Sequence, residues 1–381
     1  MSRKVIYVSY MHLSDKVSRD WYIDYLIKKG VTVEFWDVVP LLREEYEDPG
    51  VKTADYLRNF KTYAELEASL RLPENRNAYY LMLVYYEGRS ADFYKLLSKY
   101  DCKMLFISWG SFPIKSTQKW RTVLSGFSNP LYLAEKIYFR LKAIAYKKLK
   151  LVKPYEIVFA AGQVLMASKH YATKVIPINL VDYDRYRIIK SIGERLVSGR
   201  YAVFLDINLA YQSDLKIMGW PSVNPSDYYA SLNRFFELLE LKYGIQVVIA
   251  AHPRASKNVD LFNGREVFHG RTPELVRDAD FVIAHYSTSL SYAVLNSKPI
   301  IFIYTKEIEK LYKYTVMSFI RDFAEYFDAA IFNIDEITKV NQISIRDVNS
   351  DLYNDYTYKY LTSHETESIS TQDIMLREIN A

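Results

Sequence analysis

The stretch DFVIAHYSTSLSYAVLNSKPIIFIY, residues 280–304, predicts one complete strand–helix–strand unit. Its two apolar runs, at 280–285 and 299–304, are typical of strands that are buried on both faces of a sheet. Between them, hydroxyl residues open a helical segment over 287–296. A helix that joins two buried strands makes those strands parallel, so this stretch predicts parallel α/β structure.

The same alternation of strands and helices extends in both directions. A long helix over 225–243 is opened by Pro225 and closed by Gly244. We predict an α/β protein with two Rossmann-like domains that face a cleft. The amino-terminal domain would span 1–190, the carboxyl-terminal domain would span 191–363, and 364–381 would form a polar tail that frays. The other predicted strands are 4–10, 31–38, 79–86, 103–109, 157–161, 174–180, 201–206 and 246–251, and the other predicted helices are 18–29, 64–72 and 90–99, with further helices over 308–327.

The composition is that of an ordinary globular protein. Half of the 381 residues are hydrophobic and 25% are charged, with a formal net charge of +5. A single cysteine, Cys102, excludes an internal disulfide framework and a cysteine-clustered zinc site. No apolar run approaches the roughly 18 to 20 residues of a membrane-spanning helix. We therefore expect a protein that stays in the cytoplasm.

Hydroxyl residues mark the first candidate binding site. Ser287, Thr288 and Ser289 follow a strand and begin a helix, where free backbone N–H groups and the helix dipole favour an anion. One hydroxyl is enough for a helix cap, so three in a row also fit a phosphate site. Capping alone remains the alternative.

A second candidate site follows the strand 246–251. His252 can donate a hydrogen bond to a phosphate, Pro253 fixes the turn, and Arg254 can bind a phosphate with two nitrogens. The loop that carries Gly270 and Arg271, and the helix that it opens, are placed to receive a base and a ribose, with Glu274 accepting from a ribose hydroxyl. The alternatives are a surface loop and an acid that faces the helix dipole.

Five segments together resemble a known group: His252-Pro253, 272–275, 278–283, 287–289 and 298–301. This pattern, over about residues 200–305, resembles the carboxyl-terminal half of bacterial GT-B glycosyltransferases. It looks most like sialyltransferases and the related nonulosonic acid or Kdo transferases, which use CMP-sugars. The resemblance implies that His252 and the three hydroxyl residues contact the CMP phosphate. It also implies that the amino-terminal domain binds the acceptor and that the carboxyl-terminal domain binds the nucleotide sugar. The pattern is also similar to that of CDP-glycerol transferases of teichoic acid synthesis.

The family's base lies in an acid-acid-Gly motif in the first domain. Here Glu87-Gly88 matches the last two positions, and Tyr86 stands in place of the first acid. An inverting transfer needs a group that takes the proton of the acceptor hydroxyl. Glu87 is the first candidate for that role, and Asp15 and His12, in the loop after the first strand, are the others. For Glu87 a solvated loop residue is the alternative.

Two acid pairs have the spacing of a metal site. They are Asp182-Tyr183-Asp184 and Asp278-Ala279-Asp280, and neither stands among further oxygen ligands in the sequence. A structural role is the favoured interpretation, so we expect a transferase without a metal cofactor.

The segment 115–153 carries ten basic residues and one acid, Glu135. Within it, Leu133, Ile137, Leu141 and Ile144 share one helical face, and Lys136, Arg140 and Lys147 lie on another. Such a helix fits an anionic membrane surface or a phosphate-bearing acceptor, although a helix packed on its own domain is the commoner outcome. No recognition motif accompanies the charge, so nucleic acid is not an expected partner.

These features predict an enzyme that moves a sugar from a CMP-activated donor to a hydroxyl of a bacterial surface glycan, free or lipid-linked. The alternatives are a CDP-alditol phosphotransferase of the teichoic acid type and a non-catalytic subunit of a glycan-assembly complex. A nucleotide-sugar epimerase ranks lower, because such enzymes carry a Ser-Gly-Gly turn where Ser287, Thr288 and Ser289 stand here.

Overall fold

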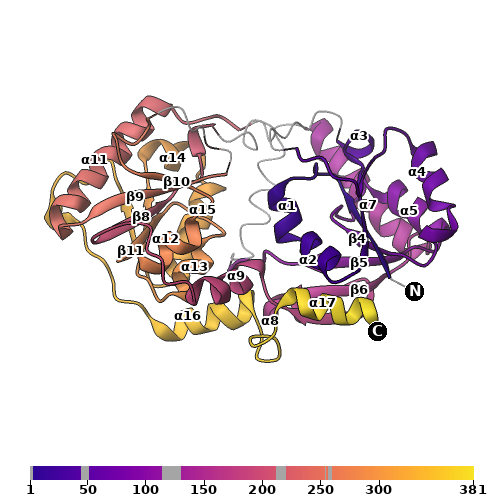
Figure 1. Cartoon of the computed structure of the whole chain (residues 1–381). Coiled ribbons are helices and arrows are strands. Elements are labelled where there is room, and N and C mark those ends of the chain that lie inside the picture. Colours follow the sequence, from indigo (N-terminus) through magenta and orange to yellow (C-terminus); the bar gives the residue numbers. More distant parts are fainter. Residues whose placement is uncertain (1–2, 44–50, 114–129, 212–219, 254, 256–259) are drawn as a thin grey trace. The chain divides into compact units, whose positions relative to one another are not determined.

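The computed structural model describes residues 3–43, 51–113, 130–211, 220–253, 255 and 260–381. The chain divides into two compact units (Figure 1). Unit 1 comprises residues 1–109, 126–181 and 362–381, and unit 2 comprises 110–125 and 182–361. Each unit is built around its own parallel sheet, as the sequence predicts.

Unit 1 contains a seven-stranded parallel sheet in the order β3-β2-β1-β4-β5-β6-β7. Its strands are β1 (Lys4–Ser9), β2 (Thr32–Asp37), β3 (Leu57–Asn59), β4 (Tyr79–Met82), β5 (Lys103–Ser108), β6 (Tyr155–Ala161) and β7 (Ala172–Ile178). Its α-helices are α1 (Asp15–Asp20), α2 (Ile23–Lys28), α3 (Val39–Leu42), α4 (Tyr63–Leu70), α5 (Ala91–Lys99), α7 (Pro130–Lys148), α8 (Gly162–Met166) and α17 (Thr371–Asn380).

Unit 2 contains a six-stranded parallel sheet in the order β10-β9-β8-β11-β12-β13. Its strands are β8 (Tyr201–Leu205), β9 (Gln246–Ala251), β10 (Val267–His269), β11 (Phe281–Ala284), β12 (Ile300–Tyr304) and β13 (Ala330–Asn333). Its α-helices are α9 (Val181–Lys190), α11 (Pro225–Tyr243), α12 (Thr272–Asp278), α13 (Leu290–Leu295), α14 (Lys306–Leu311), α15 (Val316–Tyr326) and α16 (Ser350–Tyr356), and a π-helical turn over Thr357–Leu361 follows α16.

Local signals place the long helix of unit 2 where the sequence predicts it. The Asn224 side chain accepts hydrogen bonds from the backbone N–H groups of Ser226 and Asp227, which caps α11. Gly244 ends the helix in a left-handed conformation, with φ of 60°. Every residue of β8 is buried, as its uninterrupted apolar run predicts. Strong local chemistry and the final structure therefore agree here.

The predicted helix 18–29 is wrong in one respect, because it is two helices. Tyr22 adopts a left-handed conformation, with φ of 59°, and separates α1 from α2. The break lets Tyr22, Ile23 and Leu26 enter the core of unit 1 together. Burial of these side chains thus outweighs the cost of an unfavourable backbone conformation at one residue.

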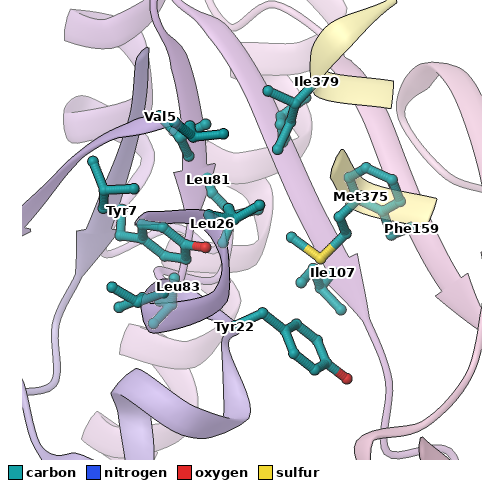
Figure 2. Packing of buried hydrophobic residues seen from close by; sticks show 14 of the residues in the cluster. Val5, Tyr7, Tyr22, Leu26, Leu81, Leu83, Ile107, Phe159, Met375 and Ile379 are labelled. Atoms are coloured by element: carbon teal, nitrogen blue, oxygen red, sulfur yellow. The ribbon is translucent and has the colours of Figure 1, made fainter. Parts of the chain in front are cut away.

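The predicted domain boundary also needs correction. The chain passes from unit 1 to unit 2 at residues 181 and 182, nine residues before the predicted boundary at 190. Residues 364–381 are not a fraying tail, because they belong to unit 1 and form α17. Met375 and Ile379 are buried in the same core as Val5 and Phe159 (Figure 2). Ile374 belongs to this core as well. The segment is polar on average, but α17 has one apolar face, and this face completes the core of unit 1.

Candidate functional site

The predicted binding residues of unit 2 meet at the carboxyl edge of its sheet. Leu205 of β8 is paired in register with Ala284 of β11, and both strands end there. Strand order reverses between β8 and β11, and open α/β sheets bind ligands at such a point. The next residues along the two strands are Asp206 and His285.

The three hydroxyl residues lie between the end of β11 and the start of α13. The Ser287 hydroxyl accepts a hydrogen bond from the backbone N–H of Ser289 at 3.1 Å, which tightens the turn. Thr288 is exposed, and within the described residues the Ser289 side chain makes no capping hydrogen bond. Ser287 therefore caps this turn, and capping does not account for the hydroxyl groups of Thr288 and Ser289.

His252 and Pro253 follow β9, on the other side of β8 from the hydroxyl residues. Neighbouring strands lie about 4.8 Å apart, so the ends of β9 and β11 are separated by about 10 Å. A ligand that contacts both His252 and Ser287 must therefore lie over the end of β8. Arg254, the third residue predicted in this loop, lies outside the described residues.

Gly270 and Arg271 follow β10, the next strand along the same edge. Gly270 has a φ of 69°, a conformation that favours glycine. The Arg271 guanidinium lies 3.3 Å from Oε1 of Glu274. Oε2 of Glu274 is buried and has no hydrogen-bond partner among the described residues. A buried acceptor is expected to have a hydrogen-bond partner, so Oε2 of Glu274 marks this position as a candidate contact for a ligand donor.

Asp206 is a residue of this edge that the sequence analysis missed. It is buried, and its carboxylate accepts hydrogen bonds from the backbone N–H groups of Asn208, at 2.8 Å, and of His252. Burial raises the pKa of Asp206 from 3.8 to about 6. The carboxylate fixes the loops that follow β8 and β9. An acid directly after an apolar strand was the signal that could have found it.

His285 has a structural role. It is fully buried, with Nδ1 at 2.7 Å from the carbonyl oxygen of Ile303 and Nε2 at 2.8 Å from the Tyr228 hydroxyl. A carbonyl only accepts, so Nδ1 carries the proton and Nε2 accepts from Tyr228. Burial lowers the pKa of His285 to about 4. The ring is therefore neutral at physiological pH and ties the end of β11 to α11 and β12.

Asp206→Asn is expected to raise the free energy of unfolding at pH 8 by about 1–3 kcal/mol, because the variant removes a buried charge and keeps an oxygen acceptor. The folded-state pKa of Asp206 lies above its unfolded value, so the parent carries a charge penalty above pH 6 and loses it as the pH falls towards 4. The gain of the variant should shrink over that window. Urea titrations at several pH values measure it.

His285→Gln is the control with the opposite sign, because it should lower the free energy of unfolding where Asp206→Asn should raise it. The folded pKa of His285 lies below its unfolded value of 6.5, so its contribution to stability is complete above pH 6.5 and is lost as the pH falls towards 4. The deficit of His285→Gln should therefore shrink as the pH falls. A gain for Asp206→Asn that does not change with pH would contradict the assignment of a buried, ionised Asp206.

The carboxyl edge of the unit 1 sheet brings His12 to a buried acid. Ser9 of β1 is paired in register with Asp37 of β2, and His12 follows three residues later. Nδ1 of His12 lies 2.6 Å from Oδ2 of Asp37, and Oδ1 of Asp37 accepts from the backbone N–H of Val39 at 2.9 Å. The buried carboxylate only accepts, so it holds the proton of His12 on Nδ1. Nε2 is then the basic nitrogen of the ring.

The other two predicted base candidates lie in more solvated positions. The Asp15 side chain is 90% exposed and lies 3.1 Å from Nζ of Lys52, in the first turn of α1. Glu87 is exposed in the loop after β4, the strand that pairs with β1. Among the described residues, the contact of Asp15 is with a lysine in a solvent-exposed position, and no buried side chain orients either carboxylate as Asp37 orients His12. A positioned base needs such an orienting group, so the geometry favours His12.

Both acid pairs have structural partners. Asp182 accepts hydrogen bonds from the hydroxyls of Ser291 and Tyr292, which attaches it to α13. Asp278 lies 2.7 Å from Arg277, and Asp280 lies 2.7 Å from Arg200. The second pair borders a cavity of about 470 Å³ at the edge where β11 and β12 begin, opposite the predicted nucleotide site. Among the described residues, no group of three or more His, Cys, Asp or Glu side chains is placed to hold a metal ion.

Comparison with known proteins identifies the fold. No protein-family model and no curated protein sequence matches the chain. Among solved structures, the wall teichoic acid polymerase TagF and a variant of it each match at 12% identity with a TM-score of 0.52, over 99% of this chain and 89% of theirs. The calicheamicin glycosyltransferase CalG4 matches at 9% identity with a TM-score of 0.47, over 100% and 93%. With its two Rossmann-like sheets, the chain has the GT-B type of fold that the sequence predicts.

Proposed function

We propose that this protein is a glycosyltransferase that moves a sialic acid-like nonulosonic acid or Kdo from a CMP-activated donor to a hydroxyl of a bacterial surface glycan. The observation that carries the proposal is the grouping of His252, Glu274 and the hydroxyl residues 287–289 at one carboxyl edge of the unit 2 sheet. Hydrogen-bond donors for a phosphate and an acceptor for a ribose lie along the same edge. The GT-B fold agrees with this function. Fold alone does not fix the substrate, so the choice of donor rests on the residues of the site.

In this proposal the donor phosphate is bound by His252 and by the hydroxyl groups of Ser287 and Thr288. These groups stabilise the negative charge that grows on the phosphate as the glycosidic bond breaks. Oε2 of Glu274 accepts from a ribose hydroxyl, which gives that buried oxygen its partner. Hydrogen bonds thus replace a metal ion at the phosphate, and we propose a reaction that needs no metal.

We assign the role of general base to His12. The acceptor hydroxyl gives its proton to Nε2 of His12 while its oxygen attacks the anomeric carbon of the donor sugar. The bond between that carbon and the phosphate oxygen breaks, and CMP leaves with the electron pair, which inverts the configuration. Asp37 is a positioning residue: it holds the tautomer and stabilises the imidazolium that forms. Glu87 is the second candidate for the base.

A CDP-linked alditol is the alternative donor. The support is the likeness in fold to the wall teichoic acid polymerase. A phosphotransferase would break the bond between the two phosphates and release CMP, whereas a CMP-sugar transferase breaks the bond between sugar and phosphate. Analysis of the product for a new phosphodiester therefore separates the two reactions.

A non-catalytic subunit is the second alternative, and Tyr86 is the residue that favours it. Tyr86 takes the place of the first acid in the family's motif, and its hydroxyl donates to the carbonyl oxygen of Ala143 at 2.8 Å. Tyr86 therefore joins two elements of unit 1 and carries no acid function. Transfer by the purified protein would exclude this alternative.

CMP and CDP are expected to raise the melting temperature of the protein, and UDP and GDP to raise it less. A ligand at a hundred times its Kd stabilises a protein by about 2.7 kcal/mol. His252→Ala should lose most of this shift, while Lys242→Ala, on the exposed end of α11, serves as the control. EDTA should leave the shift and the transfer intact. An equal response to all four nucleotides, or none, would contradict the CMP-sugar proposal.

We further propose that the protein works as a peripheral protein at the cytoplasmic, anionic face of the membrane, where lipid-linked acceptors reside. The support is the excess of nine positive charges over residues 115–153. Lys115, Lys119 and Arg121 of this segment lie outside the described residues. No helix in the described part of the chain meets the length and hydropathy needed to span a bilayer.

A further inference from the structure

Helix α7 turns its apolar side away from unit 1. Ile137, Leu141 and Ile144 lie on one helical face and are 51%, 61% and 44% exposed. Tyr138, beside them, is 59% exposed, and Ala134 and Ala145 on the same side are also exposed. A helix on the surface of a globular protein usually buries its apolar stripe. The orientation of α7 is the reverse of that arrangement, and we call this side the outer face of α7.

Contacts on the opposite side of α7 fix this orientation. Gly88 lies so close to Phe139 that a Cβ atom at Gly88 would be 2.0 Å from the Phe139 carbonyl oxygen. Lys142 and Tyr146 both bind the Asp92 carboxylate of α5, at 2.6 Å and 2.7 Å. The helix is thus held on unit 1 by backbone packing and polar contacts, and its outer face does not take part.

Basic residues flank the outer face. Lys136, Arg140 and Lys148 are exposed along α7. Lys147, which the sequence analysis placed on the polar face, is directed inward instead, with its amine over the rings of Tyr86 at 4.4 Å and Tyr171 at 4.9 Å. Among the described residues of α7, Glu135 is the one acid, and it is paired with Arg89. The outer face is therefore apolar in its centre and positive at its rim.

We infer that the outer face of α7 inserts into the interfacial layer of an anionic lipid bilayer. Its apolar residues would contact the acyl boundary, while Lys136, Arg140 and Lys148 contact lipid phosphates. A second copy of this chain fits the surface less well, because a two-fold contact along α7 would bring the same cations of both copies together. The inference rests on the proposed peripheral location and names the residues responsible for it.

Vesicle binding tests the inference. The full chain should bind vesicles of phosphatidylcholine that contain about one third phosphatidylglycerol, and bind pure phosphatidylcholine vesicles far more weakly. Ile137→Ser/Leu141→Ser should lower the affinity by about tenfold or more. The matched control is Ile188→Ser/Leu241→Ser, which removes two apolar side chains of unit 2 that are 62% and 75% exposed. The control should bind like the parent.

A fluorescent label measures insertion directly. Cys102 is buried, and burial raises the pKa of its thiol to about 12, so a new surface cysteine is labelled selectively. An environment-sensitive dye on Ile137→Cys should shift to the blue when anionic vesicles are added. The same dye on Ile188→Cys should not shift. Loss of cooperative unfolding in any variant is checked by thermal melting before it is used.

Three results would overturn the inference. They are failure of the parent to bind anionic vesicles, equal binding by Ile137→Ser/Leu141→Ser, and self-association of the parent that this variant abolishes. The last would make the outer face a contact between copies. The nucleotide response and the transfer to a short soluble acceptor do not depend on this face. If the parent shows neither the nucleotide response nor the transfer, the proposed function is rejected. The result of the vesicle-binding experiment is not affected by that outcome.

Discussion

His12→Gln is expected to lower kcat of sugar transfer by about a hundredfold to ten-thousandfold while the CMP-induced shift in melting temperature stays unchanged. Glutamine keeps a polar side chain at the position but supplies no group that takes a proton near neutral pH. The contact of Nδ1 with Asp37 at 2.6 Å is what makes Nε2 the basic nitrogen in the parent. Steady-state rates with a short soluble acceptor measure the loss.

Asp37→Asn is the companion variant. Its amide can present a donor to Nδ1 where the carboxylate presents only acceptors, which favours the wrong tautomer of His12. The pH–rate profile should then change as well as the rate, which a merely structural role would not produce. Glu87→Gln and Asp15→Asn are the comparison variants. If Glu87→Gln loses activity and His12→Gln keeps it, Glu87 is the base and our assignment is wrong.

Gly88→Ala is expected to lower the free energy of unfolding by about 1–3 kcal/mol or more and to detach α7 from unit 1. The added methyl group would lie 2.0 Å from a backbone oxygen, which cannot turn aside as a flexible side chain can. Urea unfolding measures the stability, and limited trypsin digestion at Arg140 reports the release of α7. The added methyl group should also displace the loop that carries Glu87, the second candidate for the general base. The transfer rate of Gly88→Ala therefore shows whether the position of Glu87 matters.

Gly193→Ala is the matched control for this prediction. A Cβ atom at Gly193 meets no atom within 4 Å, and its φ lies outside the region that favours glycine. Its stability should stay within about 0.5 kcal/mol of the parent, as for most surface changes. Equal stability and equal trypsin resistance of Gly88→Ala and the parent would show that α7 does not pack against Gly88 in solution.

The strands that could be predicted are those with long apolar runs, such as β8, β9 and β12, because burial on both faces leaves an uninterrupted signal. The edge strands β3 and β10 have three residues each, which is too short for any period to appear. The break at Tyr22 was also out of reach. It depends on packing of α1 and α2 into the core, and no glycine or proline marks it.

The grouping of His252, Gly270 and Ser287 at one edge of the unit 2 sheet could be predicted, because parallel strands deliver the residues after them to one side of a sheet. The pairing of His12 with Asp37 could not, because it depends on the register between β1 and β2 and joins residues 25 positions apart. The sequence predicted which residues form the outer face of α7, but not the direction in which this face points. Helical spacing groups Ile137, Leu141 and Ile144, but it does not say whether that group faces the core or the solvent.

The return of the chain to unit 1 constrains the order in which the protein is made. The core of unit 1 contains Val5 and Phe159 from its first two segments and Ile374 and Met375 from α17. During translation, the ribosome must synthesise residues 182–361, the main segment of unit 2, before α17 emerges. Unit 2, which lies almost wholly in one continuous stretch, can therefore close its core first. Unit 1 emerges first, but the apolar surface that α17 covers stays exposed until unit 2 and then α17 have been synthesised.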